Sequence, residues 1–401
     1  MVFKAEIPYG AYWSTPFARW QGSLAHLHSV RFAAHVASHE LAKRKISPET
    51  IDFGVLGITI PQQHAFYGFP WLAGLIGAKN AGGPTTMQAC ATSVRCLLLA
   101  AQEIEVGMAT TALSIACDRM SNGPHLYYPN PKGPGGTGNA EDWVMDNFNC
   151  DPLGPHAMIK TAENVAARYN FSTVRQHEVV LRREEQYRQA TANGAAFLKR
   201  FMTLPFDVPE SNFRKVTARL EGDEGIRFSN AEDLAKLKPV LEGGTVTFGG
   251  QTHPTDANAA IVVSTRDRAP DLSLDRKIRI QIHGFGLARA ELAYMPEAPI
   301  PAAARALAAS GRTVRQMDAI KTHSPFAVND LLFAAQTGVD LMKINNYGCS
   351  LVYGHPNAPM GMRGVIELIE ELTLRGGGWG LFAGCAAGDT AMAVVLRVDG
   401  G

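Results

Sequence analysis

The sequence predicts an α/β fold built from two similar halves, and three observations lead to this prediction. The chain has 401 residues, enough for two domains or for one large duplicated domain. Its composition is 46% hydrophobic and 19% charged, which supplies a large core and excludes a disordered protein. Finally, an order of helix, glycine and buried strand recurs along the chain, each time with a cysteine in a small-residue loop close by.

The first half begins with residues 30–45, where apolar residues recur at helical spacing and stop before a Ser-Pro pair. Residues 51–60 form a short apolar run rich in β-branched residues, which predicts a buried strand. A second helix is predicted over residues 93–106, where Gly107 ends it. The nearly continuous apolar content of residues 109–117 predicts a second buried strand.

The second half repeats this order of elements. The pattern predicts a strand at 278–288, a helix at 301–311, a strand running into a loop at 317–326, a helix at 359–375, and strands at 379–385 and 389–398. No strict sequence repeat is visible, so the duplication is predicted from the pattern alone.

Residues 119–244 separate the two halves and differ from both. They contain a Pro- and Gly-rich stretch, 129–139, followed by polar helices in which charge is concentrated. Such composition is typical of an excursion over the surface. We therefore expect a first half at 1–118 plus 245–270, an inserted loop domain at 119–244, and a second half at 271–401.

Charge and cysteine content narrow the functional class. The 38 Lys and Arg residues balance 37 Asp and Glu residues, for a net charge of +1, so nucleic acid is not expected as a partner. Six cysteines without C-x-x-C spacing argue against a disulfide scaffold and a structural zinc site. The N-terminus lacks the features of a signal peptide, and no apolar run could cross a membrane. A soluble cytoplasmic protein with reduced thiols is expected.

Two residues are candidates for nucleophilic chemistry. Cys90 lies between a small-residue turn and a helix, and the positive end of the helix dipole favours a thiolate there. A free cysteine is, however, more often a small buried apolar residue. His355 lies between Gly354 and Pro356, in a loop that could hold an imidazole beside a nucleophile. A turn histidine bonded to the backbone would fit equally well.

Two further residues stand in comparable positions. Cys385 lies between a buried strand and small residues, where a thiol could shuttle a proton or simply fill space. His323 ends an apolar strand and could be an ordinary loop histidine. Residue types alone leave both interpretations open.

The local contexts of these four residues carry a resemblance. QACATSVRCLLLAAQEIEVG surrounds Cys90, HAMIKTAENVAARY matches "MGxTAENVA", and GGTVTFGGQTHPTDANAA resembles "GTVTAGNASGxNDGAAA". NNYGCSLVYGHPNAPMGMR resembles "VNxxGGAIALGHPxGxSGAR", and GLFAGCAAGDTAMAVV stands in place of "CxGGGxGxA". STPFARWQGSL and DRMSNGPHLY resemble "RTPxGxxxGSL" and "MESMSxAPY". This ordered set resembles the thiolase superfamily over essentially the whole chain.

The resemblance implies a five-layered α-β-α-β-α core with an inserted loop domain. It also implies CoA-dependent cleavage of a 3-oxoacyl-CoA, or the reverse Claisen condensation, through an acyl group on Cys90. By the same resemblance His355 activates Cys90, Cys385 moves the α-proton, and His323 helps to stabilise an oxyanion. Coenzyme A is then a co-substrate. No permanently bound cofactor and no metal are expected.

Contacts to CoA are also implied. Arg227, Lys236 and Lys238 lie in a stretch resembling "MAKLRPxF" and are candidates for its phosphates, although they could equally be a solvated helix face. Thr252 and His156, within two of the motifs above, are further candidates. A homodimer or homotetramer is expected.

Departures from the family pattern bear on the substrate. The usual "NEAF" segment is HSPF here, so His323 replaces an asparagine, as in some subgroups, and the final glycine cluster is reduced to CAAGD. Aromatic residues gather around the Pro/Gly loop, namely Tyr127, Tyr128, Trp143 and Phe148. These features favour a larger or aryl-bearing acyl group, as in the benzoylsuccinyl-CoA thiolases of anaerobic aromatic breakdown, which work with a small zinc-containing partner subunit. The aromatic residues could also merely pack the loop.

Three alternatives stay open at this point. One is a short-chain acetoacetyl-CoA thiolase. Another is a decarboxylating condensing enzyme of the same superfamily, in which His323 would be the second histidine. The last is a non-catalytic thiolase-fold subunit that needs a partner protein, against which the intact Cys90, His355 and Cys385 argue.

Overall fold

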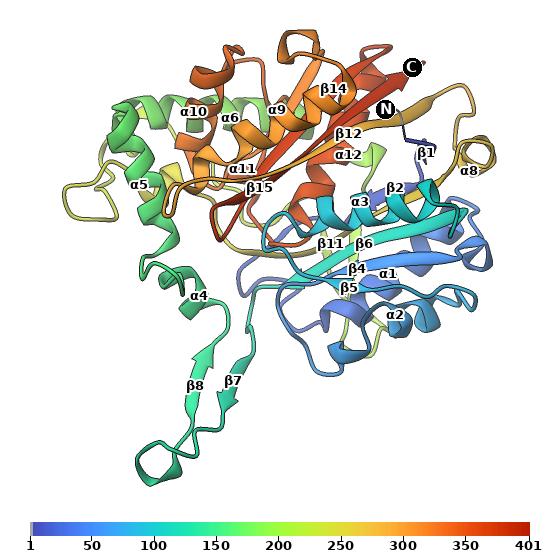
Figure 1. Ribbon diagram of the computed structural model, residues 1–401, viewed down its shortest axis with the longest axis horizontal. Helices are drawn as coiled ribbons and strands as arrows, with labels where there is room; N and C mark the ends of the chain where they lie inside the picture. Colours follow the sequence, from blue (N-terminus) through green and yellow to red (C-terminus); the bar gives the residue numbers. More distant parts are fainter. Residues whose placement is uncertain (1–2) are drawn as a thin grey trace.

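A long central sheet organises the fold (Figure 1). The computed structural model describes residues 3–401, and within them the sheet has 11 strands. Its main path runs β13 (Ala319–His323), β14 (Gly377–Ala386), β15 (Thr390–Asp399), β12 (Arg279–Arg289), β1 (Ala5–Pro8), β11 (Thr255–Thr265), β6 (Thr111–Arg119), β4 (Phe53–Gly57) and β5 (Thr85–Thr86). The short β2 (Tyr12–Ser14) and β3 (Ala18–Arg19) pair with β11.

The two sides of β1 are built alike. On one side β4 and β6 are parallel and β11 is antiparallel to β6. On the other side β13 and β14 are parallel and β15 is antiparallel to β14. Since β1 pairs with both β11 and β12, it joins the two strand groups into one hydrogen-bonded sheet.

Helices complete a layered core. The adjacent helices α3 (Thr92–Glu105) and α12 (Met360–Leu374) contact each other and strands of both groups, so they form the middle layer. On the outer face of the first group lie α1 (Ser29–Lys43) and α2 (Gly68–Ile76), and α9 (Pro299–Ser310) covers β12 and β15 of the second. The expected five-layered α/β core is therefore confirmed.

The excursion between β6 and β11 carries further elements. They are β7 (His125–Tyr128), β8 (Asn139–Asp142), α4 (Met145–Asn149), α5 (Met158–Tyr169), α6 (Thr173–Ala195), β9 (Phe206–Pro209), β10 (Val216–Leu220) and α7 (Ala231–Ala235). The strands β7 and β8 form a hairpin that projects away from the core, with the Pro/Gly stretch at its tip (Figure 1). Between β11 and β12 lies α8 (Ala269–Leu272), and the second half also contains α10 (Ala327–Thr337) and α11 (Ser350–Tyr353). The division of the chain near residues 118, 245 and 271 stays a prediction.

The helices and strands predicted in the two halves are confirmed within a few residues. The central strand β11 was not predicted, because its start is polar: Asp256 and Asn258 are buried there at the register of β6. Among residues 3–401, no helix is both long and apolar enough to span a bilayer.

A glycine sets the distance between α9 and its strands. A Cβ atom built on Gly286 of β12 would lie 1.9 Å from the carbonyl oxygen of Ala302 and 2.7 Å from the amide nitrogen of Ala306. Both atoms belong to the backbone of α9, so no side chain can rotate away. Only glycine allows the helix to approach the sheet this closely.

We expect Gly286→Ala to lower the free energy of unfolding by about 2–3 kcal/mol, because overpacking against backbone cannot relax locally. Gly74→Ala is the matched control, since a Cβ there meets nothing within 4 Å. Gly74 lies on the exposed face of helix α2, so the substitution should be neutral or slightly stabilising. Urea unfolding of both variants measures the difference, and equal stability would contradict the close contact.

Candidate active site

Cys90 occupies a tight turn immediately before α3. The preceding residue, Ala89, has a positive φ of 43°, a conformation that non-glycine residues adopt at a cost. The turn is held because the Gln88 amide donates to Thr92 Oγ1 at 2.8 Å and Arg95 Nε donates to Gln88 Oε1 at 2.8 Å. The sulfur is therefore fixed at the start of the helix.

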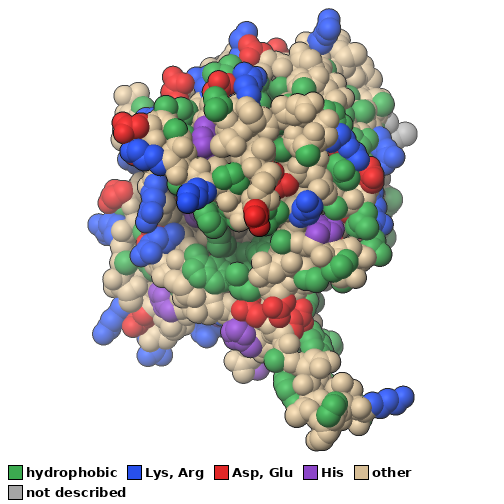
Figure 2. Space-filling view, turned by 90° about the vertical axis from the view of Figure 1, so that its left-hand side faces the viewer, with side chains coloured by type: hydrophobic (Ala, Val, Ile, Leu, Met, Phe, Trp, Pro, Cys, Tyr) green, Lys and Arg blue, Asp and Glu red, His purple; other side chains and the backbone are tan. Residues whose placement is uncertain are grey.

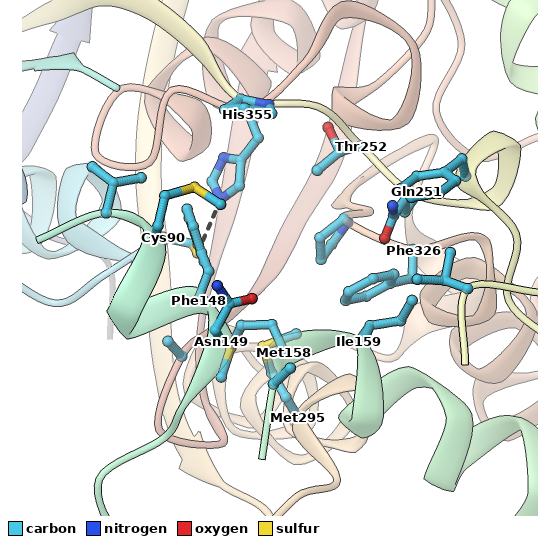
Figure 3. Close-up of a pocket in the computed structure, with 18 of the residues that line it drawn as sticks. Cys90, Phe148, Asn149, Met158, Ile159, Gln251, Thr252, Met295, Phe326 and His355 are labelled. Atoms are coloured by element: carbon cyan, nitrogen blue, oxygen red, sulfur yellow. Dashed lines mark hydrogen bonds between the residues drawn. The ribbon is translucent and has the colours of Figure 1, made fainter. Parts of the chain in front are cut away.

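His355 reaches Cys90 from the other half of the molecule. It lies in the loop between α11 and α12, and its Nε2 is 3.0 Å from Cys90 Sγ (Figure 3). Its amide donates to the carbonyl oxygen of His253 at 2.8 Å, which fixes the loop against the segment before β11. The expected thiol and imidazole thus lie within hydrogen-bond distance.

His323 and Cys385 end the neighbouring parallel strands β13 and β14. The ring centroid of His323 lies 4.3 Å from that of His355, and its Nδ1 lies 2.8 Å from Ser350 Oγ. Cys385 is fully buried and accepts a hydrogen bond from Asn329 Nδ2 at 3.3 Å. All four residues named from the sequence are therefore gathered at one centre. Cys90 and His355 line the open cavity, whereas His323 and Cys385 lie behind its wall.

Burial keeps this centre uncharged. It raises the pKa of the Cys90 thiol to about 11, while the amides of Ala387 and of Cys90 itself oppose the shift. It lowers the pKa of His355 to about 3 and that of His323 well below its ordinary value. The expectation that the helix end lowers the pKa of Cys90 is wrong for the free site, because the loss of solvation outweighs it.

A cavity of about 750 Å³ opens at Cys90, His355 and Ala387. Figure 2 shows a hollow with hydrophobic side chains above the projecting hairpin. Among the described residues, no lysine, arginine, aspartate or glutamate lines the cavity. Much of its wall is formed by Phe148, Met158, Ile159, Met295 and Phe326 (Figure 3). Met145 lines it as well.

The aromatic residues noted in the sequence have different positions. Phe148 lines the cavity. Trp143 donates from Nε1 to the carbonyl oxygen of Thr59 at 2.8 Å and so packs the loop against the first half. Tyr127 and Tyr128 lie on the projecting hairpin and are exposed. Only one of the four therefore contacts the space where a substrate would lie.

Of the residues proposed for CoA, Thr252 lines the cavity, and its Oγ1 donates to the carbonyl oxygen of Ser350 at 2.5 Å. Arg227 and Lys238 are exposed outside the cavity wall. Lys236 forms ion pairs with Glu232 and Asp233 at 3.0 and 3.1 Å, which fits the alternative of a solvated helix face. His156 also lies outside the cavity wall.

Three residues at the site were missed by sequence reasoning. Asp118, at the end of β6, accepts hydrogen bonds from the amides of Thr59, Ile60 and Ala358, each at 2.9 Å, and so ties the His355 loop to the first half. Asn329 holds the sulfur of Cys385, and Ser350 holds His323. Only Ser350 carried a signal, because the motif quoted above has alanine in its place.

A metal ion could also be held here. One ligand atom each from Cys90, His323 and His355 lie within 4.8 Å of one another. A thiolate with two imidazoles is a donor set that suits Zn²⁺. The expectation that the protein needs no metal stays a prediction.

We expect iodoacetamide to alkylate Cys90 at a rate that rises roughly tenfold per pH unit between about pH 7 and pH 9, because the thiolate fraction limits the reaction while the pH is below the thiol pKa. The sign follows from the raised pKa of about 11. Peptide mass mapping separates Cys90 from the exposed Cys150. A rate that is independent of pH across this range would instead indicate a preformed thiolate–imidazolium pair.

Comparison with known proteins agrees with this geometry. The protein-family model of the thiolase N-terminal domain matches residues 11–267, and the family model of the thiolase C-terminal domain matches residues 276–398. An acetyl-CoA acetyltransferase of Chromobacterium violaceum is 30% identical over 395 residues, covering 96% of this chain and 97% of the relative. The human mitochondrial 3-ketoacyl-CoA thiolase is 27% identical, covering 96% of each chain.

Solved structures extend the likeness to three dimensions. A crystal structure of human mitochondrial 3-ketoacyl-CoA thiolase superimposes with a TM-score of 0.89 at 25% identity, over 98% of this chain and 99% of that one. A structure of the same human protein in complex with CoA gives a TM-score of 0.87 over 99% of each chain. The chain therefore belongs to the thiolase family, has the thiolase fold, and is an acyltransferase of the thiolase type.

Proposed function

We propose that this thiolase cleaves a 3-oxoacyl-CoA with CoA, or runs the reverse condensation, through an acyl group carried on Cys90. The observation that carries the proposal is the 3.0 Å contact between Cys90 Sγ and His355 Nε2 at the opening of the cavity. The relative solved with CoA supports CoA as the co-substrate.

The first step forms the acyl-enzyme. Because burial disfavours both a free thiolate and an imidazolium, the proton moves from Cys90 to His355 as the sulfur attacks the 3-oxo carbonyl carbon. The amides of Cys90 and Ala387 face this sulfur and stabilise the negative charge that develops on the carbonyl oxygen. The bond between the carbonyl carbon and the α-carbon then breaks.

The leaving group is the enolate of an acyl-CoA, and it needs a proton on its α-carbon. Cys385 supplies the proton from its thiol, and Asn329 Nδ2, which donates to the sulfur at 3.3 Å, stabilises the thiolate left behind. His323, beside His355, stabilises the enolate oxygen as a neutral donor. CoA then attacks the acyl group on Cys90: its thiol proton goes to the Cys385 thiolate, the bond between the acyl carbon and the Cys90 sulfur breaks, and His355 returns its proton to Cys90.

The acyl group is large, uncharged and apolar. The cavity of about 750 Å³ offers methionine and aromatic side chains, which adapt to bulky alkyl or aryl groups. The free carboxylate of a benzoylsuccinyl-CoA substrate would lack a cationic partner among the described lining residues. Within the aryl-bearing class we therefore favour neutral acyl groups.

The proposal also covers the residues that contact CoA and the oligomeric state of the protein. Thr252 is the best placed of the CoA candidates, because it lines the cavity; Arg227 and Lys238 remain candidates for the phosphates at its exterior. A homodimer or homotetramer in the cytoplasm is consistent with the family. A small zinc-containing partner subunit has no separate support.

One observation favours a second function. The two histidines beside Cys90, with ring centroids 4.3 Å apart, resemble the Cys-His-His set of decarboxylating condensing enzymes. Release of CO₂ from malonyl-CoA that depends on Cys90 would identify that reaction. The buried Cys385 with its amide donor supports the thiolase instead.

Two cysteine variants separate the proposed steps. Cys90→Ala should abolish the acyl adduct seen by intact mass after incubation with an acyl-CoA, because no other residue carries the group. Cys385→Ala should keep the adduct but lose exchange of the α-proton with deuterated water, since the thiol acts only on the α-carbon. The exposed Cys150→Ser is the control and should change neither. Loss of both steps in Cys385→Ala would argue for a structural role.

The substrate proposal is tested with a panel of 3-oxoacyl-CoA thioesters in the thiolysis assay. Neutral medium-chain and aryl substrates should give kcat/KM values about tenfold or more above those of acetoacetyl-CoA and of substrates with a terminal carboxylate, because apolar contact area is gained without burying a charge. Phe148→Ala should reduce the preference for bulky substrates, since Phe148 lines the cavity. A preference for acetoacetyl-CoA would support the short-chain alternative.

A further inference from the structure

Ser350 is the only described residue that hydrogen-bonds to the imidazole of His323. It begins α11, its side chain is fully buried, and its Oγ lies 2.8 Å from His323 Nδ1. The same oxygen accepts a hydrogen bond from the Ser324 amide at 3.0 Å. No step of the proposed catalytic scheme uses this serine.

The hydroxyl proton of Ser350 determines which nitrogen of His323 is protonated. Since the oxygen already accepts from the Ser324 amide, its own proton needs an acceptor, and within residues 3–401 the only one in reach is His323 Nδ1. If Nδ1 carried a proton instead, the buried hydroxyl proton would be left without a partner, which is unfavourable. His323 Nδ1 therefore accepts, and the proton of the neutral ring is on Nε2.

The Nε2 proton has no acceptor among the described residues. His323 Nε2 is buried and has no hydrogen-bond partner in the described structure. A nitrogen of this ring lies within 4.8 Å of both the sulfur of Cys90 and a nitrogen of His355. Burial and the neighbouring His355 both disfavour a second proton on the ring. The ring thus presents one N–H donor toward the reacting groups.

The need for such a partner follows from the residue type. The NEAF and GGAIALGHP patterns quoted above have asparagine and alanine where this chain has His323 and Ser350. An amide NH₂ group is always a donor, whereas a neutral imidazole donates only from the nitrogen that its surroundings leave protonated. The histidine therefore requires a group that fixes its tautomer.

We propose that Ser350 is a positioning residue that fixes His323 as the Nε2–H tautomer, so that His323 offers a neutral N–H donor to the oxygen of the substrate. The inference rests on the proposed function for its kinetic consequence, but not for the tautomer itself. The assignment of the tautomer and the proposed function can therefore be refuted independently.

The tautomer is measured on the free full-length chain. Long-range proton–nitrogen correlation spectra of protein labelled with ¹⁵N-histidine distinguish a protonated from an unprotonated ring nitrogen, and the His323 signals are those lost in His323→Asn. We expect protonated Nε2 and unprotonated Nδ1 in the wild type, and a changed pattern in Ser350→Ala. A proton on Nδ1 in the wild type, or no change in Ser350→Ala, would overturn the proposal whether or not the protein is active.

A double-mutant cycle tests the consequence for catalysis. Ser350→Ala should lower kcat about tenfold with little change in KM, because the donor acts on charge that develops in the transition state. In the His323→Asn background the same substitution should change kcat less than about twofold, because an amide needs no tautomer. Equal losses in both backgrounds would show that Ser350 merely supports the Ser324 loop and would overturn the proposal.

Thermal unfolding of every variant identifies losses caused by misfolding. If Ser350→Ala fails to fold, Ser350→Thr retains the hydroxyl, and it should preserve both the wild-type tautomer and most of kcat. A folded Ser350→Thr protein with the opposite tautomer would count against the proposal. A wild-type protein that cleaves no 3-oxoacyl-CoA would refute the proposed function, while the spectra would still decide the tautomer.

Discussion

The contact on which the site depends is the 3.0 Å approach of Cys90 Sγ and His355 Nε2, because the two residues come from different halves of the chain. Their separation is set where the first turns of α3 and α12 meet. The Met362 amide donates to Ser93 Oγ at 2.8 Å, and a Cβ on Gly361 would lie 2.8 Å from Val94 Cγ2. A side chain at position 361 would require Val94 and Ser93 to shift, so the glycine allows the first turns of the two helices to lie this close together.

The same burial that brings these groups together removes charge from them, while one ion pair is buried behind the site. Arg183 Nε and Asp330 Oδ2 are 2.8 Å apart, and both side chains are fully buried. The other carboxylate oxygen of Asp330 accepts from Thr322 and Ser324, on either side of His323. A buried ion pair adds little net stability, but here it holds the strand end that carries the histidine. The ion pair therefore orients the strand end. Because Arg183 neutralises Asp330, the pair adds no net charge near the cavity.

Local sequence signals predicted many of the elements but not all of them. The predicted helices and strands of both halves follow from apolar periodicity, whereas β1, α2 and α10 were not predicted. The turn before α3 and the Gly-His-Pro loop follow from small and rigid residues. Features that depend on tertiary structure could not be predicted from the sequence. The polar start of β11 hides a central strand, because Asp256 and Asn258 are satisfied or enclosed only in the fold. The pKa of Cys90 depends on burial by segments that are distant in the sequence. The spacing of His323 and Ser350 in the sequence does not indicate that their side chains form a hydrogen bond.

A centre without charge makes the placement of protons decisive. With the Cys90 thiol and both imidazoles neutral, charge arises only as bonds form and break, and no counter-ion lines the cavity among the described residues. Stabilisation then comes from fixed N–H donors, which are strong in a medium of low dielectric and useless if the lone pair faces the substrate instead. An imidazole can present either face, and an amide cannot. Replacing an amide by an imidazole at such a centre therefore requires a second residue that decides where the proton is, and in this fold a buried serine hydroxyl stands in the position to do so.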